Sequence, residues 1–563
     1  MRSSFFAYYQ GDFIKSILIT SLLLAGITAT TQTPKASGFK LFAGSLYDRG
    51  SSITTDSLKN YYFTGVFQNS IFTENLQVSL DCKEVIVNTP ANFAGFLLRF
   101  DSTKKINLTI NNPQGELYNP VVDSKGNIYI PGSYDYGATS DAFLSKYSPD
   151  GQLLWTRLIQ STFNGNNASD VITSIDISKT GTLVISGFSY GDDIFIFDKK
   201  ISGPANFIAL LDKNGTIQWI NNFSSELGRG IYRVKFDEEE NIIAGGNEAL
   251  SNNGTAVVMA KLNGESGTII WKKVIMPESN SAPWIRCLSK SGDSYFFGGE
   301  FTGFINIDGT PLTSKGDIDF FILKTDKNGN IQWIKQGGGP GKDRIYDLCT
   351  LKDGSTFFTG SYSDSMVIDG SLSRSKGNAD VFIGALTNDG SLLWLKKGGS
   401  NITNQPVLNE YFYDEYGASI IVDWKNEIQV VGTTIGSGNF DNINYTSPEE
   451  AKQNAFWLTL SQKDTSFTVN YPCSAAVPPS SVSDHIKLYP NPFSQSLNIR
   501  FPGNYSPDLH LSLFNLLGQK MDARIIKNSN IVTIKDWHSL PSGMYFLKIE
   551  TPNFHQSFKV LKQ

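Results

Sequence analysis

The sequence predicts an all-β protein in which seven similar four-stranded units close into a ring, followed by a small β-sandwich. Three observations support this. A two-strand motif ending in tryptophan recurs along the chain, a short apolar run ending in glycine precedes each copy, and long helical periodicity is missing. The 563 residues are 12% aromatic and include 51 glycines, which suits many strands joined by tight turns.

The tryptophan motif is clearest from Ile318 to Gly338, IDFFILKTDKNGNIQWIKQGG, which predicts two strands around a polar turn. Asn, Asp and Gly tolerate positive φ, so the turn suits a tight hairpin. Two weaker copies, one with Leu108 at the tryptophan position and one after Gln453, bring the count to seven. The motif tryptophans are Trp155, Trp219, Trp271, Trp333 and Trp394.

A second landmark gives the same count. Each copy follows an apolar run that closes on glycine, and these glycines are about 61 residues apart on average. Each repeat therefore predicts four strands: A, with an apolar run that often closes on Asp; B, ending at the glycine; C; and D, carrying the tryptophan. Stacked equivalent units of this kind are typical of repeat architectures. The glycines are Gly65, Gly132, Gly187, Gly246, Gly299, Gly360 and Gly432.

The ends of the repeat region predict how the ring closes. The segment GFKLFAGS, aligned on Gly44-Ser45, matches the sixth strand D, LWLKKGGS, with Phe39 at the position of Trp394. This strand has no strands A to C before it, and the seventh repeat has a poor strand D after Leu460. A ring completed by the N-terminal strand removes open sheet edges. We therefore predict a seven-bladed β-propeller over residues 30–470, with six or eight blades as the alternative.

The repeats resemble the bacterial β-propeller repeat family in their DxFI and DxNGxxxW pattern. The motif is loose, so the resemblance supports the architecture and says little about activity. Because the tryptophans recur at one register, we interpret them as packing between blades, with a functional role as the alternative. Replacing Trp333 with Ala is expected to cost about 3–5 kcal/mol.

The first 29 residues predict a secretory signal peptide. Arg2 and Lys15 give a positive region before the apolar stretch from Ile17 to Ala29, which is too short to span a bilayer. Ile27 and Ala29 suit the −3 and −1 positions of a cleavage site. A membrane anchor is the alternative, and we expect no transmembrane anchor in the mature chain.

The four cysteines, Cys82, Cys287, Cys349 and Cys473, form no CxxC pair, which argues against a structural zinc site. Cys287 and Cys349 fall on strand A of adjacent repeats, where we expect small buried residues. A disulfide between Cys82 and Cys473 is the alternative use of the other two, because the first and last repeats are neighbours in a ring and an exported protein meets oxidising conditions.

A linker and a second domain follow the repeats. Residues 471–485 are rich in Pro, Ser and Ala, which predicts a linker. In residues 486–563, alternating apolar positions such as Leu497, Ile499 and Phe501 mark half-buried strands of a small β-sandwich.

This last segment closely resembles the type A C-terminal sorting domain of the type IX secretion system of Bacteroidetes. The resemblance implies export to the periplasm and passage across the outer membrane, with the secretion machinery and surface lipopolysaccharide as partners. We expect a location on the outer-membrane surface or outside the cell; an ordinary sandwich with no sorting role is the alternative. The matching positions are Tyr489, Pro490, Asn491, Pro492, Gly518 within the LLGQ turn, Gly543, Tyr545, Lys559 and Lys562.

Histidine is missing from the repeats. His485, His510, His538 and His555 all lie at the end of the linker or beyond it, so the propeller lacks the general base of Ser-His-Asp and Cys-His mechanisms and has no histidine metal ligand. We expect no catalytic residue, no metal and no cofactor there. Paired carboxylates of a polysaccharide-cleaving enzyme stay open, because the sequence does not tell which acids converge.

Three motifs imitate functional sites. Gly187 to Gly191 fits G-x-S-x-G, but no helix is expected after it. The segment around Gly341-Lys342 resembles a phosphate-binding loop with Asp343 in place of the final Ser or Thr. The DKNG turns resemble calcium loops, but their glycine comes at position four, so we predict plain hairpin turns.

Charge and loop length indicate where a ligand binds. The formal net charge is −5 with no basic block, which argues against nucleic acid. In a propeller the B–C and D–A connections share one face, and here they are the longer ones; loops on a rigid scaffold often bind ligands. The long B–C connections are Phe67 to Asn92, Ser189 to Ala205, Phe301 to Asp317, Tyr362 to Asn378 and Thr433 to Asn454.

The richest D–A connection combines aromatic and acidic residues, which suit stacking on sugars or contact with a protein. A packed loop is the alternative for this segment. The sequence thus favours a glycan- or protein-binding, adhesin-like module over an enzyme. A hydrolase or lyase acting on polysaccharide, and a structural surface component, are the alternatives. The segment consists of Tyr411, Phe412, Tyr413, Asp414, Glu415 and Tyr416.

Overall fold

The computed structural model describes most of residues 33–461 and 487–562, in two compact units that divide after Cys473. Each unit is taken by itself below. The predicted signal peptide and the linker lie outside the described residues, as do Cys82 and Cys473. The residues left out are 1–32, 43–47, 69–74, 81–82, 89–92, 113–114, 136–138, 164–165, 224–229, 250–254, 278–280, 403–414, 442, 447–452, 462–486, 490–495, 501–508, 515–519, 522–523, 529–530, 536–542, 552–553 and 563.

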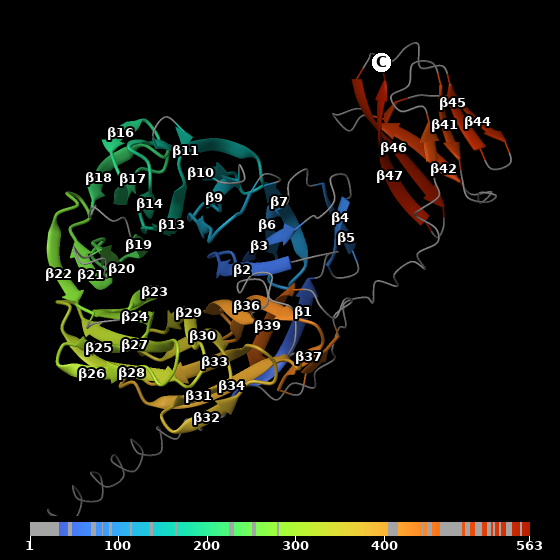
Figure 1. Ribbon diagram of the computed structural model, residues 1–563. Helices are drawn as coiled ribbons and strands as arrows, with labels where there is room; N and C mark the ends of the chain where they lie inside the picture. Colours follow the sequence, from blue (N-terminus) through green and yellow to red (C-terminus); the bar gives the residue numbers. More distant parts are fainter. Residues whose placement is uncertain are drawn as a thin grey trace, which may run out of the picture. The chain divides into compact units, whose positions relative to one another are not determined.

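The first unit consists of seven antiparallel blades arranged around a common axis (Figure 1). Each blade in the described part of the chain has four strands, paired in the order A, B, C, D from the inside outwards. The A strands of neighbouring blades touch one another near the axis, from blade 3 through blade 7 and on to blade 1. The prediction of a seven-bladed β-propeller is confirmed.

The strands of each blade follow in the order A to D. Blade 1 is β2 (Asp48–Thr55), β3 (Tyr61–Gln68), β6 (Phe93–Phe100) and β7 (Ile106–Asn112). Blade 2 is β8 (Val121–Val122), β9 (Ile128–Asp135), β10 (Ser140–Tyr147) and β11 (Leu153–Phe163), with β12 (Asn166–Asn167) paired to β11. Blade 3 is β13 (Asp170–Ile177), β14 (Leu183–Ser189), β17 (Ala205–Leu211) and β18 (Ile217–Asn222).

The remaining blades repeat the pattern. Blade 4 is β19 (Ile231–Phe236), β20 (Ile242–Ala249), β21 (Thr255–Leu262) and β22 (Ile269–Ile275). Blade 5 is β23 (Trp284–Ser291), β24 (Ser294–Phe301), β27 (Asp319–Asp326) and β28 (Ile331–Gly338). Blade 6 is β29 (Arg344–Thr350), β30 (Thr356–Tyr362), β33 (Asp380–Leu386) and β34 (Leu392–Ser400). Blade 7 is β35 (Tyr416–Val422), β36 (Ile428–Ile435), β39 (Gln453–Ser461) and β1 (Lys35–Phe42).

The repeat glycine permits a bulge in strand A. In six blades strand A gains one extra residue opposite this glycine, as between Ile285 and Cys287 in β23. The bulge presses a strand-A carbonyl against the glycine: a Cβ on Gly299 would lie 2.4 Å from the Trp284 oxygen. The DxFI phenylalanine pairs across the sheet with the same glycine, as Phe321 does with Gly299, and covers it. A bulge re-aims side chains, so this landmark determines what faces the axis.

Four of the five motif tryptophans lie on the C–D turn of the next blade; the fifth, Trp394, is buried in the core between blades 6 and 7, where strand D comes from the N-terminus. The indole of Trp333 donates a hydrogen bond to the Asn388 carbonyl at 2.9 Å and covers Gly390, which has φ +84°. Trp155, Trp219 and Trp271 cover the equivalent glycines of blades 3, 4 and 5, and Leu108 covers that of blade 2. The tryptophans therefore join neighbouring blades, as the sequence analysis expected, although most of them are half-buried.

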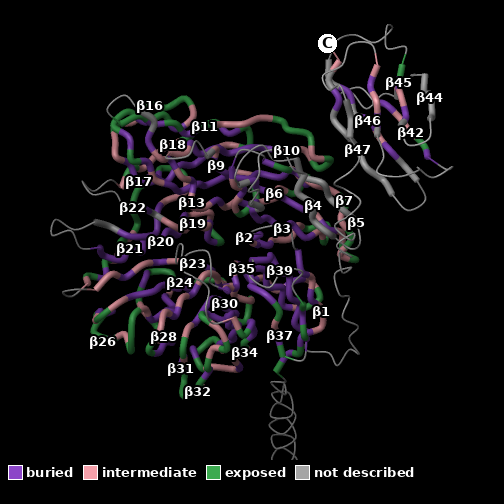
Figure 2. Tube along the Cα trace, turned by 45° about the vertical axis from the view of Figure 1, so that its right-hand side comes forward, coloured by how far each residue is buried: buried purple, intermediate pink, exposed green. Residues whose placement is uncertain are grey.

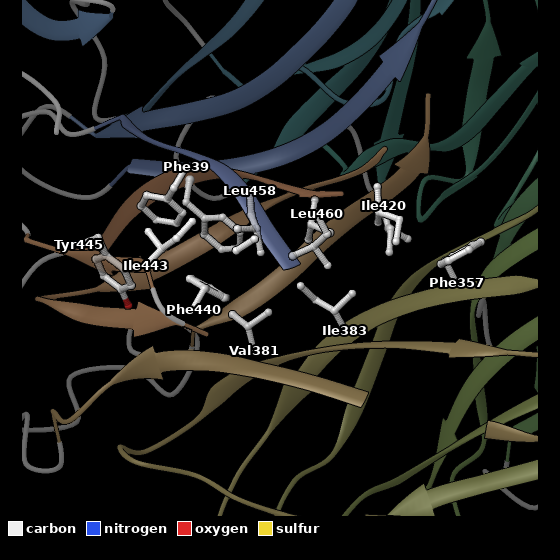
Figure 3. Close-up of a cluster of buried hydrophobic side chains, with 14 of the residues drawn as sticks. Phe39, Phe357, Val381, Ile383, Ile420, Phe440, Ile443, Tyr445, Leu458 and Leu460 are labelled. Atoms are coloured by element: carbon white, nitrogen blue, oxygen red, sulfur yellow. The ribbon is translucent and has the colours of Figure 1, made fainter. Parts of the chain in front are cut away.

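The ring closes through β1, which pairs with β39 of blade 7 as predicted. The expected alignment was wrong by one residue: Gly38, and not Phe39, occupies the tryptophan position, because Gly38 pairs with Thr459 directly after the strand-D bulge at Ser37. Phe39 instead packs against Tyr445 and Phe456, at centroid distances of 5.0 and 6.0 Å. Figure 3 shows Phe39 and Tyr445 in this buried cluster.

Where blade 7 meets blade 1, the small residue Gly38 stands at the tryptophan position and the large residue Lys104 stands at the turn-glycine position. Lys104 occupies the turn position that is glycine in the other described C–D turns, also at positive φ (63°). Its ammonium lies 4.9 Å from the Trp457 ring and donates to the Thr459 hydroxyl at 2.6 Å. Burial lowers the pKa of Lys104 to about 8. Lys104 thus fills the space that Gly38 leaves open.

Most long B–C connections are hairpins that extend the preceding blade. Thus β15 pairs with β11, β31 with β28 and β37 with β34, while β25 reaches blade 4 through a bridge from Ile305 to Pro277. Much of the length of these connections therefore covers outer strand edges. The hairpins are β4 (Asn75–Leu80) with β5 (Lys83–Asn88), β15 (Asp193–Ile196) with β16 (Lys199–Ser202), β25 (Phe304–Ile307) with β26 (Thr310–Thr313), β31 (Ser365–Ile368) with β32 (Ser371–Arg374), and β37 (Gly438–Phe440) with β38 (Ile443–Tyr445).

Burial follows the blade order: strands B and C are almost continuously buried, whereas most hairpin strands at the rim alternate between buried residues and more exposed ones (Figure 2). Polar side chains link the inner strands. The Asp176 carboxylate accepts from the Phe236 amide at 2.8 Å, and the Ser289 hydroxyl accepts from the Thr350 amide at 3.1 Å. Cys287 and Cys349 are free thiols on these strands, the first fully buried.

The second unit has two four-stranded sheets around one core. Leu497, Leu513 and Tyr545 are among its buried residues, in agreement with the predicted alternation. One sheet is β40 (Lys487–Tyr489), β41 (Leu497–Arg500), β45 (Ile531–Lys535) and β44 (Arg524–Asn528). The other is β43 (Lys520–Met521), β42 (His510–Phe514), β46 (Gly543–Thr551) and β47 (Phe554–Lys562). Among the described residues of the whole chain, no helix is long and apolar enough to cross a membrane.

Candidate ligand-binding site

The strand-A bulge gathers large side chains at the inner ends of blades 4 to 7. These ends lie on the face from which the B–C and D–A connections leave, where the sequence analysis expected a ligand. The bulge residue of one blade meets the residue two positions before the bulge of the next blade. We call the set the inner-strand arc: Tyr232 from β19, Trp284 and Arg286 from β23, Glu300 from β24, Arg344 and Tyr346 from β29, and Tyr416 from β35.

Aromatic pairs stand at both ends of the arc. Tyr232 and Trp284 have ring centroids 5.6 Å apart at an interplanar angle of 43°, and Phe188 of blade 3 lies 6.4 Å beyond Tyr232. At the other end, Tyr346 and Tyr416 are 5.0 Å apart at 35°. These four arc rings are half-buried, so each keeps part of its surface exposed to solvent.

Two arginines share one carboxylate between these aromatic pairs. Glu300 is only 5% exposed and accepts a hydrogen bond from Arg286 at 2.5 Å. Arg344 of the next blade brings its Nε to 3.9 Å from the other carboxylate oxygen. Burial lowers the pKa of Arg286, but the Glu300 carboxylate more than offsets this, so the pKa is raised and the guanidinium stays charged. The Arg286 guanidinium also lies 5.3 Å from the Trp284 ring centroid, within cation–π range.

The arginine network is not saturated. Among the described residues, Nε of Arg286, Nε of Arg344 and Oε2 of Glu300 have no hydrogen-bond partner. The side chains of Arg286 and Arg344 keep 32% and 19% of their surface exposed. Native structures pair almost all buried polar atoms, so these three atoms are available to a further hydrogen-bond partner such as water or a ligand.

Two further charged residues, Asp347 and Arg233, lie next to the arc. Asp347 accepts hydrogen bonds from the Ser419 hydroxyl at 2.8 Å and the Ile420 amide at 2.9 Å, and so joins blade 6 to blade 7. Burial raises the pKa of Asp347, while the charge of Arg233 opposes the rise. With Arg233 set against Asp347, the arc itself has two guanidinium groups and one carboxylate.

The structure divides the predicted ligand segment. Tyr411, Phe412, Tyr413 and Asp414 lie outside the described residues. Glu415 is 2% exposed, and its carboxylate accepts from the Ser400 and Ile435 amides, both at 2.8 Å. These contacts hold the start of β35 against blade 6, out of reach of an external ligand. Tyr416, in contrast, belongs to the arc.

The inner carboxylates that could serve a polysaccharide-cleaving enzyme already have partners. Glu116 pairs with Arg49 at 3.3 Å, Glu300 with Arg286, and Asp347 with blade 7. No group of three or more His, Cys, Asp or Glu side chains that could hold a metal ion occurs among the described residues.

The three imitating motifs are structural. Ser189 of the G-x-S-x-G segment ends β14, and its hydroxyl accepts from the Gly191 amide at 3.4 Å. At the phosphate-loop imitation, the Lys342 amide donates to Ser363. In the DKNG turn, Asp326 accepts from the Asn328 amide at 2.9 Å, so the turn is a plain hairpin turn.

Buried carboxylates recur where strand C of one blade meets the start of strand A in the next. Burial raises the pKa of Asp343 to about 7, with the Asp319 charge of blade 5 adding to the rise. Burial also raises the pKa of Asp380 to about 6 and of its neighbour Glu415 to about 7. Each folded-state pKa exceeds that of the unfolded chain, so the unfolded chain loses its proton first. Stability therefore falls as the pH rises between about 4 and 7.

Comparison with known families identifies the family of the second unit. Residues 487–563 match the family described as the secretion system C-terminal sorting domain. This segment is a type IX sorting domain. It directs the chain through the secretion machinery to the cell surface or the extracellular space. The predicted sorting positions Tyr489, Gly543, Tyr545, Lys559 and Lys562 lie on its described strands, whereas Pro490 to Pro492 and Gly518 lie outside the described residues.

Two solved structures that the chain resembles are distant from it. A mutant of the Synechocystis apocarotenoid oxygenase is 10% identical, covers 66% of this chain and 94% of its own, and has a TM-score of 0.30. The Pyrococcus horikoshii acylaminoacyl peptidase is 9% identical, with 69% and 57% covered and a TM-score of 0.25. Likenesses this weak carry no argument about activity. A search of curated proteins gave no match.

The sequence analysis missed the arc apart from Tyr416. A signal was present: Trp284-Ile285-Arg286 and Arg344-Ile345-Tyr346 place large polar or aromatic residues on both sides of the strand-A isoleucine. Regular alternation would have pointed these side chains into the sheet interfaces. The bulge that brings them together became visible only with the strand register.

Proposed function

We propose that the propeller is an exported, adhesin-like binding module that holds a glycan at the inner-strand arc. The observation that carries this proposal is the arrangement of two aromatic pairs, Tyr232 with Trp284 and Tyr346 with Tyr416, around a partly exposed arginine pair. Aromatic faces pack against the C–H faces of sugar rings, and guanidinium donors bind ring substituents. Four blades contribute to one surface, so a ligand can contact several units at once.

A rigid support favours binding at this surface. Hydrogen bonds between neighbouring inner strands, such as those from Ser419 and Ile420 to Asp347, fix the spacing of the arc residues. A site held in place before binding loses little conformational entropy when the ligand arrives. Tyr411 to Asp414 are separated from Tyr416 in the chain by Glu415 alone, and we propose that they add a further contact to the same ligand.

The sorting domain supports the setting of this activity. It carries the propeller to the outside of the cell, where the glycans of neighbouring cells and of the surrounding matrix are the ligands within reach. We propose that the exported propeller is attached to surface lipopolysaccharide after the sorting domain has acted. Engagement of inner carboxylates such as Glu300 in ion pairs favours binding over polysaccharide cleavage.

The test is a glycan array probed with the purified full chain, with product analysis of every hit. We expect binding without turnover, and at least a tenfold loss of affinity in Trp284→Ala. The matched control is Phe195→Ala, which removes an aromatic ring that is 46% exposed at the rim and should leave affinity unchanged. Equal affinity of Trp284→Ala and wild type would place the site elsewhere, and product formation would make the protein an enzyme.

A further inference from the structure

The charge of the inner-strand arc identifies the kind of glycan. Within the arc, Arg286 and Arg344 carry two positive charges and Glu300 carries one negative charge. The remaining arc side chains are neutral aromatic rings. The surface between the aromatic pairs therefore has an excess of one positive charge.

The positive charge of the arc is carried by guanidinium groups, whose planar shape suits an anionic ligand. Arg286 uses one terminal nitrogen for Glu300, and each guanidinium carries five N–H donors in a planar fork. Such a fork matches the paired oxygens of a carboxylate or a sulfate better than a point charge does. The half-buried setting screens the charge less than bulk water would, so its interaction with an anion is strengthened.

The aromatic neighbours make the ligand a sugar rather than a free anion. Tyr232 and Trp284 on one side and Tyr346 and Tyr416 on the other offer ring faces next to the arginine pair. An anionic group between the guanidinium groups thus places the ring that bears it, or the adjacent rings of a chain, within reach of both aromatic pairs.

We infer that the arc binds an acidic polysaccharide, with a carboxylate or sulfate substituent held by Arg286 and Arg344. This inference rests on the proposed function and adds the chemical class of its ligand. Arg344 is the specificity-determining residue, because Arg286 already neutralises Glu300 at 2.5 Å while Arg344 stays 3.9 Å from it.

The test uses pairs of polymers that differ only in charge. Polygalacturonate is compared with its methyl ester, and dextran sulfate with dextran, each titrated into the purified full chain. We expect the charged member of at least one pair to bind at least tenfold more tightly, and binding to weaken as salt is added. Preference within the first pair identifies a carboxylate, and preference within the second identifies a sulfate.

Substitutions at Arg344 test whether the preference for the charged polymer depends on the arc. Arg344→Gln should reduce affinity for the acidic polymer at least tenfold, and Arg344→Lys should restore only part of it because the fork is lost. Arg374→Gln, an equal change of charge on the exposed rim strand β32, is the matched control and should have no effect. The unfolding midpoint of each variant shows whether the fold is retained, and Arg344→Lys serves if the glutamine variant does not fold.

The outcomes separate the two proposals. Equal binding of the esterified and charged polymers would overturn the acidic ligand and leave a glycan-binding propeller in place. No binding of any polymer would remove both. Competition by polyglutamate at equal strength would favour an acidic protein partner instead. Loss of binding in Arg374→Gln as well as Arg344→Gln would show that diffuse charge, and not the arc, attracts the polymer.

Discussion

The contact between Trp333 and Gly390 predicts a measurable coupling between blades 5 and 6. Trp333→Ala removes the indole hydrogen bond to Asn388, which contributes about 1 kcal/mol. It also removes the apolar contacts of a half-buried ring, roughly half of the 3–5 kcal/mol that a fully buried tryptophan loses. The expected cost is about 3 kcal/mol, at the lower end of the range expected from the sequence.

The partner residue makes the prediction specific. Gly390→Ala places a methyl group 2.8 Å from the indole and forces alanine to φ +84°, which costs about 1–2 kcal/mol in backbone strain alone. Once Trp333 is alanine, only the strain remains. The double variant should therefore be more stable than the sum of the single changes predicts, by at least about 0.5 kcal/mol.

The assay is urea unfolding of the full chain, followed by circular dichroism for wild type, both single variants and the double variant. Leu153→Ala, at a position 56% exposed on blade 2, is the control and should change stability by less than about 0.5 kcal/mol. A Trp333→Ala cost no larger than that control, or strict additivity in the double variant, would refute the packing argument.

Further predictions follow from particular contacts. Wild type should lose stability between about pH 4 and pH 7, and Asp343→Asn should flatten that slope, since a carboxyl whose pKa rises to about 7 on folding lowers stability by up to about 4 kcal/mol over this range; an unchanged slope in urea midpoints would contradict this. Glu415→Gln should cost about 1–3 kcal/mol in the same assay, because its amide N–H group would face a backbone N–H, while glycan affinity stays unchanged. Gly38→Trp should destabilise the ring and Lys104→Gly should rescue it, a pattern that thermal melting of single and double variants would show or exclude. Removal of residues 487–563 should leave the protein in the periplasm, as cell fractionation and immunoblotting would detect; full export of the truncated chain would exclude the sorting role.

The sequence was sufficient to predict the ring because its landmarks are tied to backbone geometry. The repeat glycine marks the bulge, the DxFI phenylalanine covers it, and the tryptophan covers the next turn. The register error at β1 arose because Gly44-Ser45 resembles the end of blade 6, while the closing joint carries Gly38 and Lys104 in place of tryptophan and glycine. The sequence around Gly38 does not reveal this exchange, because its partner Lys104 lies in a different blade.

The rim hairpins were missed although their turns left a signal. Asp308-Gly309 and Asp369-Gly370 both have two positive φ angles, the pattern of the tight turns that Asp-Gly favours. The sequence marks these hairpins, but it does not say that they pair with the outer strand of the preceding blade. That pairing is long-range and depends on blade packing, as does the bulge that brings the arc residues together.

The most direct test of the account is a crystal structure of the full chain soaked with an acidic oligosaccharide. The account predicts electron density for the sugar at the inner ends of blades 4 to 7, with its carboxylate or sulfate within 3.2 Å of Arg286 or Arg344, a normal hydrogen-bond distance, and its rings against Trp284 or Tyr416. Density at the rim hairpins or on the opposite face, with the arc unoccupied, would contradict it.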